Sequence, residues 1–222
     1  EATGFMLVGK ILADKPINRR GAVGVLSNMW HGKDAPTIRK FGGNIFGFAF
    51  KSEKAMNLAL DNSPWTVMGN CLSLKKWEVE EVISDIHFEE VQYWIQIHGL
   101  PLEMQTDENV KRVGSRLGIV ICADKVEWGG MIWRSFLRVR VAIDTSKPLL
   151  PGFWVPRDGK DMLRVRLKYE RLGDFCYGCG KIGHTQKSYE TNGDDSGFKT
   201  FGPWMRAAPV KNVPMSNSEK AA

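Results

Sequence analysis

Apolar and polar positions follow a regular order over the first eighty residues. Short apolar or alternating runs predict strands at 5–12, 37–41, 44–51 and 71–77. Apolar residues at helical spacing predict a helix over 17–30 and a second helix that begins after an N-capping Ser52 and ends at Leu60. The order is β-α-β-β-α-β, the arrangement of ferredoxin-like folds. Residues 1–80 are therefore expected to form one α+β domain.

RNA-recognition (RRM) domains share this order and read RNA with aromatic side chains on the exposed face of the sheet. Residues 43–50 look similar to the third strand of such domains. Side chains alternate along a strand, and this points Phe46, Phe48 and Phe50 into the core. The open face is then left to Leu7, Ile45 and Gly47. We expect an RRM-like domain that lacks the usual RNA surface.

The middle of the chain predicts a second, related α+β unit over 88–172. Its predicted strands are 91–97, 119–127, 135–143 and 162–169, with a linker at 147–159. Thr106 is a suitable N-cap for a helix that runs to Leu117 and that Gly118 stops.

Two strands of this unit carry basic residues at alternate positions. Arg138 and Arg140 share one face of the first strand, and Arg164, Arg166 and Lys168 share one face of the second. Guanidinium groups at this spacing form a positive surface that matches phosphates. The alternative is a solvated sheet face whose charges keep the protein in solution. We favour phosphate binding, because these strands lead directly into a metal-binding motif.

That motif lies in residues 173–190. Cys176, Cys179 and His184 have the spacing C-x2-C-x4-H, which supplies the first three ligands of a zinc knuckle. The fourth ligand of such a knuckle falls at position 189, which is Tyr189 instead of Cys. Tyr189, Glu190 or a water molecule are the alternatives for the fourth corner. The sequence alone leaves open whether one zinc ion is held.

The knuckle also offers groups that suit single-stranded nucleic acid. Lys181 and Lys187 are expected to attract phosphates, and Tyr177 and Ile182 to form a small apolar plate for unstacked bases. Sequence preference is expected to be slight, because phosphate contacts position a protein without naming bases.

Composition narrows the function classes. The chain has 222 residues and a net charge of +6, which favours a polyanionic partner. No apolar run is long enough to span a membrane. The four histidines share no spacing with carboxylates or a nucleophile, so we expect no catalytic activity. Cys71 and Cys122 are expected to be buried core thiols, which favours a reducing compartment, the nucleus or the cytoplasm. The tail, 191–222, is expected to be mostly disordered apart from a docking segment at 201–206.

Several short motifs occur in a defined order along the chain. They are Leu7-Val8-Gly9-Lys10, Pro64-Trp65 followed by Trp77, Gly99-Leu100-Pro101, Lys147-Pro148-Leu149, Tyr169-Glu170-Arg171-Leu172 and Phe201-Gly202-Pro203-Trp204-Met205-Arg206. With them the chain resembles plant proteins that join a DUF4283 domain to a CCHC zinc knuckle, many of which come from LINE-type (non-LTR) retrotransposons. The family carries Cys at the position of Tyr189.

The resemblance implies a gag-like protein that packages single-stranded nucleic acid, expected to be RNA, without catalysis. The alternative is a module for self-association or protein–protein binding with a vestigial knuckle. The tryptophans near predicted strands would suit such an interface: Trp128, Trp133 and Trp154.

Overall fold

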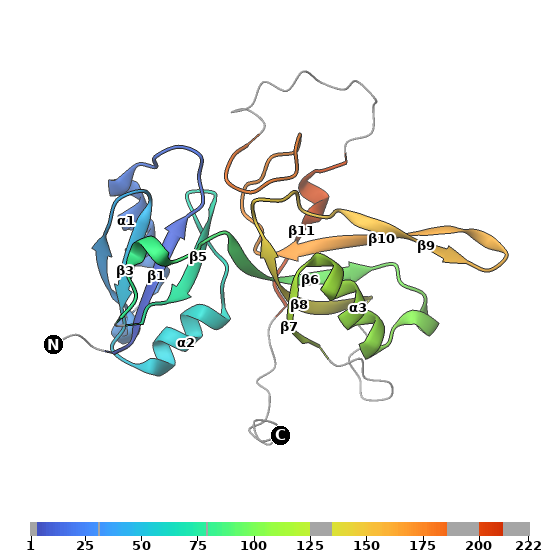
Figure 1. Cartoon of the computed structure of the whole chain (residues 1–222), viewed down its shortest axis with the longest axis horizontal. Coiled ribbons are helices and arrows are strands. Elements are labelled where there is room, and N and C mark those ends of the chain that lie inside the picture. Colours follow the sequence, from blue (N-terminus) through green and yellow to red (C-terminus); the bar gives the residue numbers. More distant parts are fainter. Residues whose placement is uncertain (1–3, 31, 79, 125–134, 186–199, 211–222) are drawn as a thin grey trace.

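The computed structural model describes residues 4–30, 32–78, 80–124, 135–185 and 200–210. These residues form an α+β protein with two sheets that lie side by side (Figure 1). The first sheet draws on the first third of the chain and the second sheet on the rest. No helix in the described ranges has the length and apolar character needed to cross a membrane.

The first sheet has the strand order β2-β3-β1-β5-β4, and each neighbouring pair is antiparallel. Its elements are β1 Met6–Ile11, α1 Arg19–Met29, β2 Thr37–Lys40, β3 Ile45–Ala49, α2 Glu53–Asp61, β4 Trp65–Val67 and β5 Asn70–Lys76. The Ser52 hydroxyl accepts the N–H of Ala55 at 3.2 Å, which confirms the predicted N-cap of α2. The sequence did not predict β4, which is too short to show alternation.

Both faces of the first sheet are covered. Phe46, Phe48 and Phe50 are buried, as the alternation predicted. Leu7 lies opposite Phe48 and is also fully buried, so the expectation that it lies on an open face is wrong. On the other face, the rings of Phe41 and Trp77 pack edge to face, and a Cβ at Gly47 would lie 2.9 Å from the Phe41 ring. No stacking platform of the RRM kind is open there.

The second sheet has the order β11-β10-β6-β8-β7, with β9 paired to β10. Its elements are β6 Glu90–His98, α3 Asp107–Leu117, β7 Ile119–Ala123, β8 Phe136–Asp144, β9 Gly152–Arg157, β10 Lys160–Glu170 and β11 Arg206–Ala207. Short 3-10 turns complete the described chain: η1 Gly32–Asp34, η2 Ile83–Asp85, η3 Leu102–Met104 and η5 Pro203–Met205. Thr106 caps α3 as predicted, since its hydroxyl accepts the N–H of Asn109 at 3.2 Å.

One face of the second sheet forms a core and the other carries its polar residues. The core face includes Ile95, Val139 and Leu167, and α3 packs on it through Val110 and Gly114. Residues 152–157, predicted as part of a linker, form β9 and make a hairpin with β10 that extends to one side of the molecule (Figure 1).

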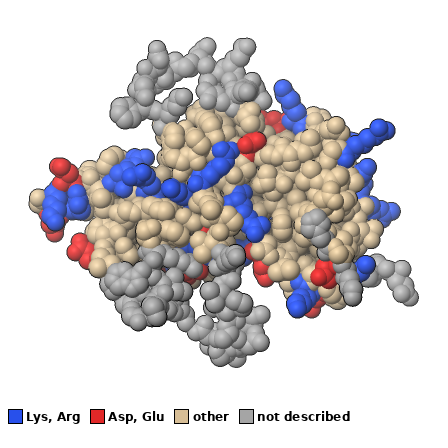
Figure 2. Space-filling model, turned by 180° about the vertical axis from the view of Figure 1, so that it is seen from behind, with Lys and Arg blue, Asp and Glu red and all other residues tan. Residues whose placement is uncertain are grey.

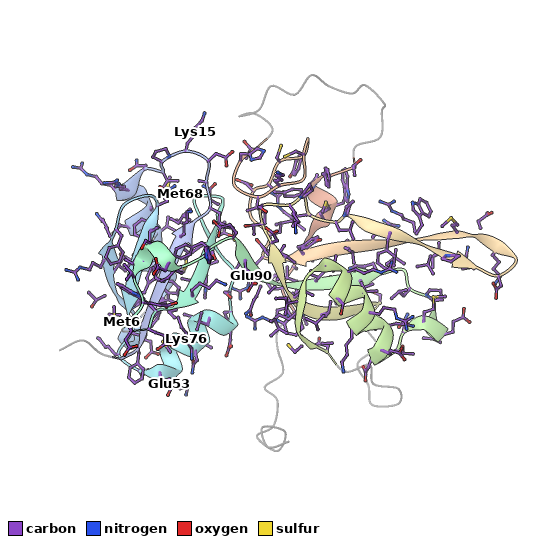
Figure 3. All side chains as sticks on the ribbon, in the orientation of Figure 1. Met6, Lys15, Glu53, Met68, Lys76 and Glu90 are labelled. Atoms are coloured by element: carbon purple, nitrogen blue, oxygen red, sulfur yellow. The ribbon has the colours of Figure 1, made fainter. Side chains whose placement is uncertain are left out.

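The two sheets meet along a few specific contacts. The Tyr93 hydroxyl donates to Cys71 Sγ at 3.2 Å, and Arg140 donates to the carbonyl oxygen of Leu60 at 3.2 Å. Glu90, which lies between the sheets in Figure 3, pairs with Lys75 at 3.5 Å. Burial raises the pKa of the Cys71 thiol to about 11. Cys71 is thus the buried thiol that the sequence predicted, whereas Cys122 is exposed and that expectation is wrong.

Candidate metal centre and nucleic-acid surface

Cys176, Cys179 and His184 come together as the spacing predicted. Their ligand atoms all lie within 4.8 Å of one another, and Cys179 Sγ is 3.3 Å from His184 Nε2. Two ligands of a tetrahedral zinc ion, with bonds of about 2.0–2.3 Å, stand about 3.5 Å apart. The three side chains therefore fit one zinc ion.

A tight hairpin places these ligands. The N–H of Gly180 donates to the Cys176 carbonyl at 2.8 Å, and the N–H of Cys176 donates to the Lys181 carbonyl at 2.9 Å. Gly180 and Gly183 have φ of +76° and +105°, a region that side chains rarely adopt. The glycines inside the motif are therefore required by the backbone of the turn.

The environment of Cys179 disfavours the thiolate in the absence of a cation. Burial raises the pKa of its thiol above the ordinary value, the nearby Cys176 adds to the effect, and the backbone N–H of Lys181 opposes it. A metal ligand must be a thiolate, so a cation is needed to offset the cost of placing negative charge here.

Asp14, from the segment after β1, orients the His184 ring. Its carboxylate Oδ2 lies 3.1 Å from His184 Nδ1, and its backbone N–H donates to the Gly183 carbonyl at 2.9 Å. This leaves Nε2 turned toward Cys179. A carboxylate on the second ring nitrogen is a common way for proteins to fix a metal-ligating histidine.

The other residues predicted to act in the knuckle differ in where the structure places them. Lys187, Tyr189 and Glu190 lie outside the described residues. The fourth ligand predicted at Tyr189 or Glu190 therefore stays a prediction. Lys181 is exposed. Ile182 is buried in the second core, so it is not part of an open plate for bases, and that expectation is corrected.

Tyr177 is half-buried and engaged within the chain. Arg206 donates a short hydrogen bond to its hydroxyl, and the Arg206 guanidinium lies 5.7 Å from the Tyr177 ring centre and 5.5 Å from that of Phe175. The docking segment predicted at 201–206 thus packs on the knuckle, with Met205 fully buried.

Arg138 and Arg140 do share a face of β8, but neither is free to meet phosphate. Arg138 is 3% exposed and donates to both carboxylate oxygens of Glu170 at 2.8 Å. Arg140 is half-buried against α2, where it donates to the Leu60 carbonyl. The phosphate role predicted for these two arginines is corrected, because alternation gives the face of a strand but not what covers it.

The basic residues of β10 have a different environment. Arg164 and Arg166 are exposed and Lys168 is half-buried, all on the face opposite the core. Figure 2 shows Lys and Arg side chains in a row over this unit, from the end of the β9–β10 hairpin at the left toward the middle of the molecule. This part of the predicted phosphate surface faces solvent.

Sequence reasoning missed two groups at the site, Asp14 and Arg206. Asp14 is distant in the chain from the knuckle and belongs to no motif. Arg206 lies in the predicted docking segment, but nothing in the sequence pairs it with Tyr177.

Two family models match the chain. Residues 1–84 match a domain of unknown function, DUF4283, and residues 143–191 match a zinc knuckle. Both agree with the resemblance seen in the sequence, and the second covers the Cys176, Cys179 and His184 cluster. Among curated proteins the chain has no match.

Proposed function

We propose that this chain, with its DUF4283 domain at residues 1–84 followed by a zinc knuckle at 143–191, is a non-catalytic nucleic-acid-binding protein of the retrotransposon gag-like kind. Its ligand is single-stranded nucleic acid, RNA in the first place, inside the cell. The observation that carries the proposal is the Cys176, Cys179 and His184 cluster, in a chain that also has a basic sheet surface with exposed Arg164 and Arg166.

We infer a ferredoxin-like arrangement for the first unit. The support is the element order β1-α1-β2-β3-α2, completed by β5, in an antiparallel sheet with β1 and β3 at its centre. Since both faces of this sheet are covered, the unit serves as a support for the second unit and the knuckle.

One zinc ion would be held by Cys176, Cys179 and His184. Bound there, it neutralises the thiolates and closes the hairpin, so its role is structural. Lys181, exposed beside the ligands, is then fixed at the surface.

Attraction to phosphates would come from Lys181 and from the β10 residues Arg164, Arg166 and Lys168. Contacts of this kind release counterions, so affinity falls linearly with salt on a logarithmic scale, with a slope of about −0.7 per neutralised phosphate of a single strand.

The test is a titration of a labelled single-stranded RNA with the zinc-loaded chain at several salt concentrations. With three to five phosphate contacts we expect a slope between about −2 and −3.5. A flat salt response, or no binding at low salt, would contradict the proposal.

A double variant, Arg164→Gln with Arg166→Gln, should reduce the size of the slope by about 1.4. The matched control neutralises Arg19 and Arg20, which are exposed on α1 of the first unit. This control should leave the slope nearly unchanged. Equal losses in both variants would mean that net charge, and not the β10 surface, governs binding.

Self-association is the second candidate function. The observation that favours it is β7, an edge strand of the second sheet on which Ile119 and Ile121 are 64% and 46% exposed. Exposed edges of this kind pair readily with other strands. A molecular mass that rises with concentration, in a chain without RNA affinity, would favour this function over the first.

A further inference from the structure

The polar face of the second sheet carries aromatic rings as well as cations. Arg166 lies directly opposite His98, and His98 lies directly opposite Phe136 on the next strand. Arg164 lies opposite Trp154 on β9. Directly opposed residues of antiparallel strands point to the same face, so all five side chains share one surface.

Trp154 is the more open of the aromatic groups. It is 55% exposed, and the Arg164 guanidinium lies 5.2 Å from its ring centre. The Trp154 ring exposes apolar area to water, whereas its neighbours on β9, Phe153 and Val155, pack against the core. The flanking cation holds the ring in place and leaves part of its surface free.

His98 and Phe136 form the second aromatic group. Their ring centres are 5.0 Å apart and their planes are tilted by 37°. His98 Nε2 lies 3.1 Å from Gln96 Oε1, and Gln96 in turn donates to Glu170 at 2.8 Å. The imidazole is thus fixed by a chain of hydrogen bonds that ends in the buried part of the sheet.

The charge state of His98 suits stacking. Burial, and then the positive charges of Lys168 and Arg166, lower its pKa below the ordinary value. The ring is therefore mainly uncharged at neutral pH and presents a flat surface beside the cations of β10.

The knuckle provides no comparable surface in the described residues. Ile182 is buried, and Tyr177 is bound by Arg206, which also lies over its ring. Trp154 also has a guanidinium over its ring, that of Arg164, but it is 55% exposed, whereas Tyr177 is half-buried and its hydroxyl is bound as well. A base therefore has more free ring surface to stack on at Trp154 than at Tyr177.

We propose that Trp154 and the His98–Phe136 pair stack bases of a single-stranded nucleic acid, while Arg164 and Arg166 contact its phosphates. This assignment rests on the proposed function and names the surface that performs it. The two aromatic groups lie two strands apart, about 10 Å across the sheet, so each takes a different base. Stacking on rings accepts any base, so the surface binds with little sequence preference.

The first test compares Trp154→Ala and Trp154→Phe with the unchanged chain, all zinc-loaded, in binding to a labelled single-stranded uridine-rich RNA. Removal of the ring should weaken binding by about 5- to 150-fold, and Phe should retain most of the affinity. The salt slope should stay the same, because no phosphate contact is lost. Met162→Ala is the matched control, since Met162 is 57% exposed on the same hairpin and has no ring. Its affinity should be unchanged.

A second measurement locates the contact directly. Ultraviolet crosslinking of the same RNA, followed by mass spectrometry of the peptides, should find uridine on Trp154, His98 or Phe136. A duplex of the same sequence should give no such crosslinks, because its bases are already stacked.

The outcomes separate two failures. If the unchanged chain binds no single-stranded nucleic acid, the proposed function falls. If it binds with the expected salt dependence but Trp154→Ala binds equally well, or the crosslinks lie on Tyr177, only the stacking surface is overturned. A loss of affinity in Trp154→Ala together with a smaller salt slope would also overturn it, because the ring would then act by placing the arginines.

Discussion

Glu170 is the residue on which the buried polar contacts of the second sheet converge. It accepts from Arg138 at both oxygens, from the Gln96 amide at 2.8 Å, and from the backbone N–H of Val210 at 3.3 Å. The Arg138 guanidinium lies 3.8 Å from the centre of the Trp94 ring. Arg138 is 3% exposed and Glu170 is 2% exposed, so water compensates neither charge.

Glu170→Gln should therefore destabilise the fold strongly. The substitution keeps the shape but removes the buried counter-charge of Arg138 and leaves the longer pair with Asp124, at 3.5 Å, at a cost of up to about 3–5 kcal/mol in the free energy of unfolding. Denaturant unfolding measures it. In the control, Glu108→Gln breaks an exposed pair with Arg112 on α3, and it should cost less than about 0.5 kcal/mol. Similar costs for both variants would contradict the view that burial makes the difference.

For single residues, the sequence predicts which face of a strand a side chain occupies but not which other side chains contact it. Alternation placed Arg138 and Arg140 correctly on one face, and Phe46, Phe48 and Phe50 correctly in the core. It could not predict that Glu170, thirty-two positions from Arg138, would occupy the same face and bury the guanidinium. In the sequence, an arginine that faces solvent and an arginine in a buried ion pair give the same alternating pattern. Only the position of the partner strand tells them apart.

The helix α3 packs on its sheet at Gly114 with no room for a side chain. A Cβ at Gly114 would lie 2.8 Å from Val120 and 3.0 Å from Val139, both of them stiff β-branched side chains. In α1, by contrast, a Cβ at Gly24 would meet nothing within 4 Å. The two glycines occupy helices of equal length but opposite surroundings.

Alanine at these two positions should have opposite effects. Gly114→Ala forces α3 away from β8 and should lower the free energy of unfolding by about 1–3 kcal/mol. Gly24→Ala removes the flexibility of glycine without a clash and should raise it by about 0.5–1 kcal/mol. Thermal or denaturant unfolding of both variants checks the pair. Stabilisation by Gly114→Ala would show that the helix can move aside freely.

Elements with strong local signals were predictable and the others were not. Ser52 and Thr106 cap the two helices that the sequence assigned to them, because a cap is a contact between near neighbours. The strand β9 was missed because its run, Gly152–Arg157, contains Pro156 and follows Pro151, which are typical of a linker. Residues 152–157 form a strand because they pair with β10, and this pairing has no signal in their own sequence.

For the whole molecule, the knuckle joins parts of the chain that are far apart in sequence. It contacts Asp14 through Gly183 and His184, and the carbonyl of Gly180 accepts the N–H of Leu149 at 2.9 Å. A Cβ at Gly180 would lie 2.5 Å from the Phe201 ring. The first domain, the segment between β8 and β9, and the docking segment thus all meet at the hairpin that carries the metal ligands.

Asp14→Ala should therefore weaken zinc binding. The His184 ring loses the carboxylate that orients it, and loss of such a partner lowers metal affinity by about 10- to 100-fold. Asp14→Asn, whose amide oxygen can still accept from the ring, should lose less. Competition with a chromogenic chelator measures the affinity.

The control for this prediction is Asp34→Asn, an exposed carboxylate of the same domain that lies outside the knuckle contacts described above. It should bind zinc like the unchanged chain. An unchanged affinity in Asp14→Ala would mean that the hairpin alone positions His184.

No sequence pattern predicts these contacts of the knuckle with distant parts of the chain. The metal-ligand spacing within 176–184 was recognisable because it is local, and the three side chains do converge. The contact between Asp14 and His184 spans most of the chain and depends on how the two units pack. The contact between Arg206 and Tyr177 likewise depends on how distant segments pack. It occupies Tyr177, which the sequence predicted to be open for stacking with bases.

The parallel pairing of β11 with β10 bears on the order in which the protein can be made. Arg206 pairs with Tyr169 and Ala207 with Glu170, while Val210 donates to the Glu170 carboxylate. On a ribosome these residues emerge after every other described strand. A nascent chain can complete its first sheet early, since domains fold as units from the N-terminus. The second sheet can pair β11 with β10, and Glu170 can accept from Val210, only after residues 206–210 have emerged.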